Sequence, residues 1–362
     1  MWPIARMVVT AASAIALSGG ITATTATEAR ADDLSPNEIF ERVAPATVQV
    51  LVANEGNGTG IIYDAEQGLI LTNAHVVAGH ASLQVRIADG DPVPVRLMAS
   101  DPCEDLAVVK LATPQKDLNQ VEFGNSGDLK QGDEVTAIGY PVGAGDISKE
   151  KAVLTSGVVQ SPDVGMEGNV SIFPDLPSTV QHSATLNGGN SGGPLLNGNA
   201  ELVGINTFSL SGTEGQYYSI SSNHAQPLLQ GLADGQSKDN PGWQGLISIS
   251  DPDFASYFSE DAQTDALALQ KRLLANNIDG LFVSTVDSNS PAADAQLVPG
   301  DVITQLKDSP VNTVQQVCDI LQSSTPGEKL GVTGAYTDSG TYDDGTPYAF
   351  GDPWQINVTL KQ

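Results

Sequence analysis

Short hydrophobic stretches, alternating or continuous, follow one another from residue 47 to residue 207, separated by glycines and acidic turn residues. Almost none of them has the spacing of an amphipathic helix. Many short strands with turn signals between them are typical of an all-β barrel or sandwich. After a short amphipathic helix at 36–43, the sequence predicts strands at 47–52, 58–63, 68–72, 83–87, 93–97, 106–111, 134–139 and 153–159.

The pattern changes after residue 223, where a helical stretch at 224–232 is followed by the polar, breaker-rich segment 233–242. Beyond it, strands and helices mix, which predicts a compact α+β module of about 120 residues. The expected strands are 245–249, 280–286 and 301–306, and the expected helices are 261–275, 291–295 and 313–322. The sequence therefore predicts a β domain over 32–232, a linker at 233–242 and a second domain over 243–362.

The N-terminus has the pattern of an export signal. Arg6 precedes an apolar run at 7–20 that is too short to span a bilayer comfortably, and Ala29-Arg30-Ala31 fits a cleavage site. We therefore expect residues 1–31 to be a signal peptide and the protein to be exported, either periplasmic or extracellular. A retained signal, which would anchor the protein to the membrane, is the alternative.

Acidic residues dominate the charge, with 43 Asp and Glu against 16 Lys and Arg, so the formal net charge is −27. Phosphate binding needs positive charge, so nucleic acid is not an expected partner. The four histidines and two cysteines form no ligand cluster in the sequence, and neither a metal nor a cofactor is expected. Cys103 and Cys318 are far apart, and two isolated buried thiols are favoured over a bridge.

One serine, Ser191, stands between two pairs of glycines in the stretch 187–195. A serine hydroxyl becomes a useful nucleophile only when a base takes its proton and something stabilises the oxyanion that follows. Glycines permit a tight turn and the close approach of a substrate carbonyl. The alternative is a plain glycine-rich turn between two strands, so the assignment depends on finding partners for Ser191.

Two candidate partners lie upstream. His75 directly follows a buried strand, and an imidazole can take and return a proton near neutral pH. Asp105 opens an apolar strand, where a partly buried carboxylate could orient an imidazole. The alternatives are an ordinary histidine and a solvated turn acid, and the neighbouring Asp101 and Glu104 are expected to be solvated turn acids.

Together these stretches resemble the trypsin-like serine proteases of the HtrA (Deg) family. The order His, Asp, Ser is that of the double β-barrel proteases. The resemblance implies a mainly β fold, with a chymotrypsin-like double β-barrel protease domain. It also implies that Ser191 is the nucleophile, His75 the general base and Asp105 the residue that orients His75, with the amides of Gly189 and Ser191 as the oxyanion hole. The matching stretches are 58–62, 69–77, 101–111, 123–129, 132–141, 187–195 and 202–207.

The resemblance also places Leu186 and Leu210 in the S1 pocket. Because the Leu186 position carries neither an acid nor a base, small to medium aliphatic residues such as Val or Ala are expected before the cleaved bond. One departure stands out, since His182 replaces a threonine that is usual in the family. Either a structural role or a role as a second catalytic group is compatible with the sequence.

The C-terminal module resembles a PDZ domain, with Pro299-Gly300-Asp301-Val302-Ile303 as its most specific motif. PDZ domains bind a peptide as an added strand and hold its terminal carboxylate with backbone N–H groups. By this resemblance the loop formed by Trp243, Gln244, Gly245 and Leu246 would bind the carboxylate of C-terminal peptides. The acidic, glycine-rich segment 337–353 is expected to be an inserted hairpin loop.

The resulting hypothesis is an exported serine endopeptidase that cleaves unfolded or damaged polypeptides and so serves protein quality control. Two alternatives remain open: a catalytically silent chaperone or peptide-binding scaffold on the same fold, and a narrow regulatory protease with one signalling substrate. The family resemblance also implies a possible homotrimer.

Overall fold

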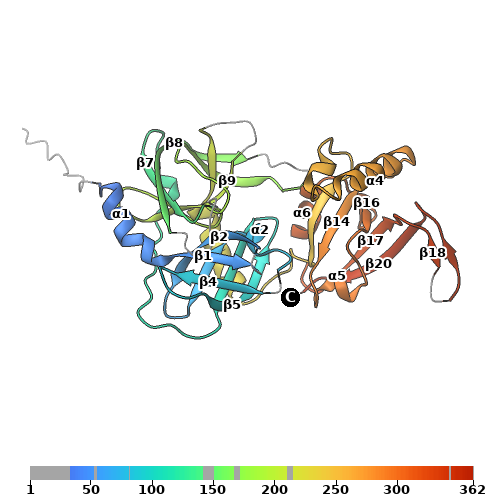
Figure 1. Ribbon diagram of the computed structural model, residues 1–362, viewed down its shortest axis with the longest axis horizontal. Coiled ribbons are helices and arrows are strands. Elements are labelled where there is room, and N and C mark those ends of the chain that lie inside the picture. Colours follow the sequence, from blue (N-terminus) through green and yellow to red (C-terminus); the bar gives the residue numbers. More distant parts are fainter. Residues whose placement is uncertain are drawn as a thin grey trace, which may run out of the picture. The chain divides into compact units, whose positions relative to one another are not determined.

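The structure is a computed structural model, and it describes residues 33–52, 55–80, 82–141, 151–166, 172–209, 215–341 and 344–361. The predicted signal peptide lies outside the described residues. The described chain is mainly β, with two closed six-stranded barrels and a smaller α+β sheet. Figure 1 shows the first barrel in blue to cyan, the second in green to yellow, and the α+β part in orange to red. The predicted fold class is confirmed.

The first barrel is closed by six antiparallel strands in the order β1, β2, β3, β6, β5, β4. Its interior is filled by inward-facing aliphatic side chains with no exposed surface, such as Val48, Ile61, Ile70 and Val108. A short helix, α2 (Ala74–Val77), follows β3 and carries His75. The strands are β1 Thr47–Val52, β2 Glu55–Asp64, β3 Leu69–Thr72, β4 Leu83–Ile87, β5 Val93–Asp101 and β6 Leu106–Leu111.

The second barrel has the order β10, β11, β12, β9, β8, β7 and is closed by pairing of β10 with β7. Its core includes Val135, Val180, Leu195 and Val203, each at most 1% exposed. Helix α1 (Pro36–Val43) precedes the first barrel, and helix α3 (Ser222–Ala233) follows the second. The strands are β7 Glu134–Gly139, β8 Val153–Met166, β9 Leu176–His182, β10 Pro194–Leu196, β11 Leu202–Ser209 and β12 Tyr217–Ser221.

The C-terminal sheet has the order β13, β14, β15, β17, β20, with the short β16 paired to β15. Strand β13 is therefore an edge strand. The segment predicted as an inserted hairpin contains the two-stranded ladder of β18 and β19, which supports that expectation. The elements are β13 Trp243–Ser248, α4 Gln263–Ala275, β14 Leu281–Val286, α5 Pro291–Asp294, β15 Val302–Leu306, β16 Ser309–Pro310, α6 Val314–Gln322, β17 Lys329–Ala335, β18 Gly340–Thr341, β19 Pro347–Tyr348 and β20 Pro353–Thr359.

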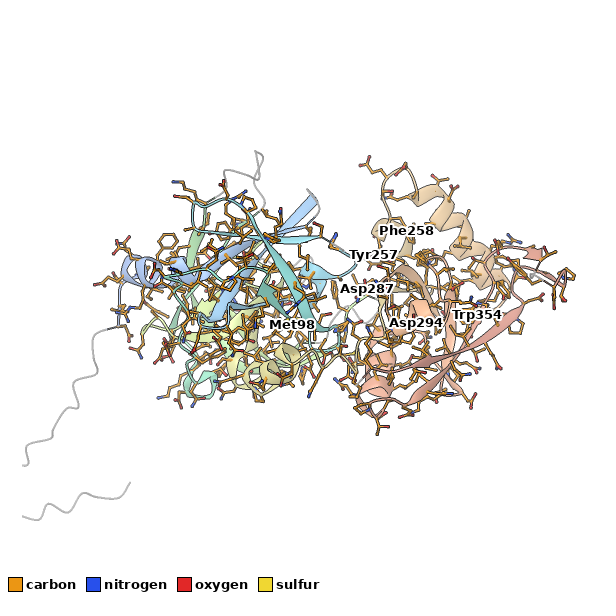
Figure 2. All side chains as sticks on the ribbon, turned by 90° about the horizontal axis from the view of Figure 1, so that it is seen from below. Met98, Tyr257, Phe258, Asp287, Asp294 and Trp354 are labelled. Carbon is orange, nitrogen blue, oxygen red and sulfur yellow. A yellow bond between two sulfur atoms is a disulfide. The ribbon has the colours of Figure 1, made fainter. Side chains whose placement is uncertain are left out.

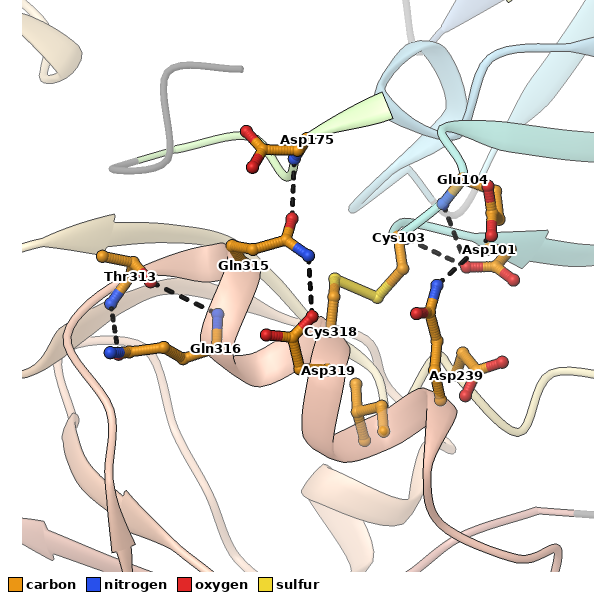
Figure 3. The surroundings of a disulfide bond; sticks show 12 residues. Asp101, Cys103, Glu104, Asp175, Asp239, Thr313, Gln315, Gln316, Cys318 and Asp319 are labelled. Carbon is orange, nitrogen blue, oxygen red and sulfur yellow. Dashed lines mark hydrogen bonds between the residues drawn. A yellow bond between two sulfur atoms is a disulfide. The ribbon is translucent and has the colours of Figure 1, made fainter. Parts of the chain in front are cut away.

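Cys103 and Cys318 form a disulfide, with their Cα atoms 5.4 Å apart and a sequence separation of 215 positions. Cys103 belongs to the turn between β5 and β6, and Cys318 belongs to helix α6 (Figure 3). The expectation of two isolated thiols is therefore wrong. The distance along the chain gave no sign that this turn and this helix lie side by side.

Hydrogen bonds flank the bridge. The Glu104 carboxylate accepts from the Gln322 amide at 3.2 Å, and the Asp175 backbone N–H donates to the Gln315 side-chain oxygen at 2.7 Å (Figure 3). From the predicted linker, the Lys238 ammonium donates to the carbonyl oxygen at the end of α6, that of Leu321, at 2.9 Å. Helix α6 is thus attached to the barrel side of the chain at several points. Within the described residues, no helix is both long and apolar enough to cross a membrane.

Candidate active site

The glycine-flanked serine directly follows a tight turn that is formed by residues 187–190. The backbone N–H of Asn190 donates to the carbonyl oxygen of Asn187 at 3.0 Å, which closes the turn. Gly189, its third residue, has a φ of 97°, whereas Gly188 does not have a positive φ. A positive φ at the third position alone is the signature of a type II turn, which favours glycine there. This turn type fixes the direction of the Gly189 N–H.

Two further glycines let the serine loop approach neighbouring strands, one in each barrel. A Cβ atom on Gly192, whose φ is 84°, would overlap the Thr59 carbonyl oxygen and the Thr72 hydroxyl. A Cβ atom on Gly193 would lie only 2.4 Å from the Ile138 carbonyl oxygen. Both positions therefore require glycine, because the backbone of β2 near Gly192 and that of β7 near Gly193 come too close for any side chain.

Thr59, a buried residue of β2, fastens this loop to the first barrel. Its hydroxyl donates to the Gly189 carbonyl oxygen at 2.7 Å, and its backbone N–H donates to the Ser191 carbonyl oxygen at 2.8 Å. The same hydroxyl accepts the backbone N–H of Tyr140, from the end of β7, at 2.9 Å. One threonine thus joins the serine loop and both barrels. Thr59 lies in one of the stretches that carry the family resemblance, but no pattern in the sequence assigned it a role.

His75 and Asp105 meet as the sequence analysis expected. The His75 Nδ1 atom lies 2.9 and 3.0 Å from the two carboxylate oxygens of Asp105, and the His75 backbone N–H donates to the same carboxylate at 3.1 Å. The Asp105 side chain is 3% exposed and the His75 side chain 28% exposed. Because the buried carboxylate holds Nδ1, proton exchange with a nucleophile or a substrate would have to use the other ring nitrogen, Nε2.

Asp105 has a φ of 50°, which a non-glycine residue rarely adopts. The side-chain amide of the buried Asn73 donates to the Asp105 carbonyl oxygen at 2.9 Å and helps to hold this conformation. Backbone strain of this kind is common where a functional side chain has to be aimed. The turn before β6 thus directs the carboxylate towards His75 instead of solvent.

Thr207, in β11, links Asp105 to Ser191. Its hydroxyl donates to the second carboxylate oxygen of Asp105 at 2.7 Å, and its carbonyl oxygen accepts the Ser191 hydroxyl at 3.0 Å. The three predicted residues therefore converge through one buried threonine. Thr207 was not among the residues expected at the site, although it ends a stretch that carries the family resemblance. A polar residue directly after the apolar run of a barrel strand was the available signal.

Of the two expected S1 residues, Leu186 is 7% exposed and packs in the core of the second barrel, whereas Leu210 lies outside the described residues. His182, the unusual residue of β9, has no exposed surface. Its Nε2 atom lies 2.9 Å from the Ser219 hydroxyl. Burial lowers the pKa of the His182 imidazole to about 4, so the ring is neutral at ordinary pH.

The predicted carboxylate loop at Trp243 to Leu246 is instead part of the edge strand β13, so the expectation of a loop is wrong here. Gly245 has a φ of 58° and interrupts the regular pairing with β14. A cavity of about 340 Å³ runs along this strand and helix α6 and reaches His75. Tyr257 and Phe258, labelled in Figure 2, also line it.

The two acids before Asp105 are not solvated turn residues, which corrects that expectation. Burial, then the charges of Asp239 and Glu104, raise the pKa of the Asp101 carboxyl to about 7. Glu104 lies 2.6 Å from the His224 Nε2 atom, and this hydrogen bond raises the pKa of His224. The docking of α3 and of the segment after it against this turn shields both carboxylates from water.

Family models match two parts of the chain, a trypsin-like peptidase domain at residues 58–205 and a PDZ domain at residues 263–334. Among curated proteins, the periplasmic pH-dependent serine endoprotease DegQ of Escherichia coli is 33% identical over 287 residues, which cover 76% of this chain and 56% of DegQ. The serine protease Do-like HtrA of Bacillus subtilis is 34% identical, covering 74% of this chain and 57% of that protein.

A solved structure of an AlgW variant, an HtrA-type protease with tripeptide, matches with a TM-score of 0.50 at 26% identity, covering 91% of this chain and 98% of that one. With both domains matched and in the same order, the chain belongs to the HtrA-type family of trypsin-like serine proteases with a PDZ domain. It spans little more than half the length of the curated relatives named above.

Proposed function

We propose that this protein is a serine endopeptidase that cleaves polypeptides through an acyl-enzyme. Ser191 is the nucleophile, His75 the general base and then the general acid, and Asp105 the residue that orients His75. The observation that carries the proposal is the hydrogen bond from Thr207 to the Asp105 carboxylate, made by the residue whose carbonyl also accepts the Ser191 hydroxyl, at 2.7 and 3.0 Å. Relatives named as serine endoproteases support it.

The proposed mechanism follows from which atom holds each proton. The Ser191 hydroxyl has one proton, now donated to the Thr207 carbonyl, so attack on a substrate requires that this bond be exchanged for one to His75 Nε2. Nε2 takes the Ser191 proton as the Ser191 oxygen bonds to the substrate carbonyl carbon. The Asp105 carboxylate accepts a hydrogen bond from Nδ1–H, without taking that proton, and stabilises the imidazolium that forms. The imidazolium then returns its proton to the leaving amine. Water repeats the sequence to release the acyl group.

We assign the oxyanion hole to the backbone N–H groups of Gly189 and Ser191. Neither N–H is needed to close the turn, which uses the N–H of Asn190. The positive φ of Gly189 supports this assignment, because in a type II turn the central peptide is turned over relative to type I. One oxyanion donor typically contributes about 3 kcal/mol to the barrier.

We further propose that the C-terminal domain binds the C-termini of peptides along the edge strand β13, opposite helix α6. An edge strand has free backbone groups to which an extended peptide can be added. The groove is lined by apolar side chains of both elements, including Leu246, Val314 and Leu321, which suits an apolar terminal residue. Trp243 to Leu246 remain the proposed carboxylate-binding residues, now from within the strand.

The groove and the catalytic domain are joined through Cys318, which lies on α6 and is bonded to the turn two residues before Asp105. Peptide binding against α6 would therefore act on the turn that carries Asp105, the residue that orients His75. On the same grounds we take 233–242 as the segment that joins a protease domain at 32–232 to a PDZ domain at 243–362.

Unfolded or damaged polypeptides are the proposed substrates, with Val or Ala before the cleaved bond because Leu186 brings no charge to the S1 pocket. The names of the relatives, several of them periplasmic, support export directed by residues 1–31. A homotrimer is proposed from the family alone. Digestion of unfolded casein separates a general from a narrow protease, because a narrow regulatory enzyme would leave casein intact.

A fluorescent fluorophosphonate tests the chemistry, because it reacts only with a serine that has an activated hydroxyl and an oxyanion hole. We expect stoichiometric labelling of Ser191 in the folded full-length protein, located by peptide mass mapping, and none after unfolding in urea. A folded protein that stays unlabelled would support the catalytically silent scaffold instead.

A further inference from the structure

His182 is a departure from the family pattern that the catalytic mechanism above does not use. It has no exposed surface, and neither have Ser219 and Asn206, the two residues that follow it in a chain of side-chain hydrogen bonds. His182 Nε2 lies 2.9 Å from the Ser219 hydroxyl, and that hydroxyl donates to the Asn206 side-chain oxygen at 2.9 Å. Each polar group costs free energy to remove from water, so this buried series of hydrogen-bonded side chains calls for a structural or functional explanation.

The donor and the acceptor of each hydrogen bond in this series follow from the partners of Asn206. The Asn206 side-chain N–H donates to the Pro194 carbonyl at 3.2 Å, so its oxygen faces Ser219 and must accept. The single Ser219 proton is therefore given to Asn206, and Ser219 can only accept from His182. His182 must then carry its proton on Nε2, and burial, which keeps the ring neutral, makes this the one proton it has.

The far end of the chain reaches the nucleophile loop. The backbone N–H of Gly192 donates to the Asn206 carbonyl oxygen, and the backbone N–H of Asn206 donates to the Gly193 carbonyl oxygen, both at 2.8 Å. These are the two residues directly after Ser191, where side chains are excluded by the first barrel at Gly192 and by the Ile138 carbonyl of β7 at Gly193. Asn206 therefore sets the position of the loop that carries the nucleophile.

We propose that His182 is a positioning residue for Ser191 that acts through Ser219 and Asn206, and that it does so as the Nε2–H tautomer. It is not a second catalytic group, because a side chain with no exposed surface cannot touch a substrate. The inference rests on the proposed peptidase function.

Two substitutions of similar size separate positioning from mere filling of the core. In His182→Gln the side-chain N–H can occupy the place of Nε2 and donate to Ser219, whereas in His182→Asn the shorter amide reaches only the place of Nδ1. We expect the Asn variant to lose about tenfold in kcat, with KM changed by less than about twofold, and the Gln variant to stay within about threefold of the natural protein. The readouts are hydrolysis of a peptide p-nitroanilide with valine before the cleaved bond and the rate of fluorophosphonate labelling.

Ser219→Ala interrupts the same chain one residue further on. Because both changes break one pathway, the double variant with His182→Asn should be little worse than either single variant. Additive losses would contradict the proposal, and so would equal activities of the Gln and Asn variants. Thermal melting checks that all variants are folded.

A pH series gives a second readout. The unfolded His182 imidazole takes up a proton below its ordinary pKa, but the folded one does so only near pH 4, so the folded protein loses stability as the pH falls between these values. His182→Gln should remove this part of the acid destabilisation, and an unchanged acid limb of the melting temperature would count against a buried neutral ring. Failure of the natural protein to hydrolyse any substrate would refute the proposed function instead, and is distinguishable from these outcomes.

Discussion

The loop that carries Ser191 and the turn that carries Asp105 are both tight, yet they are held in different ways. The Ser191 loop is held by neutral hydrogen bonds from the two barrels, such as those of Thr59 and Asn206. The Asp105 turn is held by a disulfide to helix α6 and by carboxylates whose charge depends on pH. The Ser191 loop is thus held by the two barrels alone, whereas the Asp105 turn is connected to the PDZ domain.

The largest expected effect concerns the Ser191 loop. Ser191→Ala should lower hydrolysis of casein by about 10⁴-fold or more, because no other group in the loop can form the acyl-enzyme. The melting temperature should stay within a degree or two, since Ser191 is held mainly by its backbone. Comparable turnover by the variant would show that Ser191 is not the nucleophile.

Thr207 forms hydrogen bonds with both Ser191 and Asp105. Thr207→Val keeps the shape but removes the hydrogen bond to the buried Asp105 carboxylate, which should lower kcat/KM by about 10- to 100-fold, as expected for a bond to a charged acceptor. Thr207→Ser keeps the hydroxyl and is the matched control. If the Val and Ser variants had the same kcat/KM, the hydroxyl would have no part in orienting Asp105.

Removal of the disulfide tests the connection between the Asp105 turn and helix α6. Cys103→Ser should destabilise the protein by about 2–4 kcal/mol, because the bridge constrains a long stretch of the unfolded chain. The measurement is the urea midpoint, together with the rate at which an added protease cleaves the 233–242 segment. Cys318→Ser and the reduced natural protein should behave like Cys103→Ser, and three differing results would point to effects other than loss of the bridge.

The smallest expected effect concerns Asp101. Its folded pKa of about 7 lies above its ordinary value, so the folded state holds a proton that the unfolded state has released, and stability is lost as the pH rises towards 7. Asp101→Asn should therefore stabilise the protein by about 1–2 kcal/mol at pH 8 and by much less at pH 4. Asparagine keeps the oxygen that accepts the backbone N–H groups of Cys103 and Glu104.

A stabilisation by Asp101→Asn that is equal at both pH values would show that the carboxylate charge is not its cause. In the disulfide-free variant the same substitution should stabilise less, because a loosened α6 leaves the turn more open to water. This double variant therefore measures how far the PDZ domain controls the environment of Asp105.

The sequence by itself determined the strands of the first barrel, β7 and the first half of β8 in the second, the α+β module and the candidates His75, Asp105 and Ser191. It gave no sign of β9 or β12. Alternation, turn residues and glycines are local signals, and a short apolar run ending in one polar residue can be seen without knowing its neighbours. For the same reason the glycines at 192 and 193 could be recognised, although not the atoms that they make room for.

Only the tertiary structure decided which distant residues touch. It brought Thr207 to Asp105, Ser219 to His182 and Cys103 to Cys318, and it left the acids that were expected to be solvated only partly exposed. A contact between residues 37 or 215 positions apart leaves no local pattern in the chain, because it depends on the closure of barrels and the docking of a helix. Burial and pKa are properties of that packing and not of the residue alone.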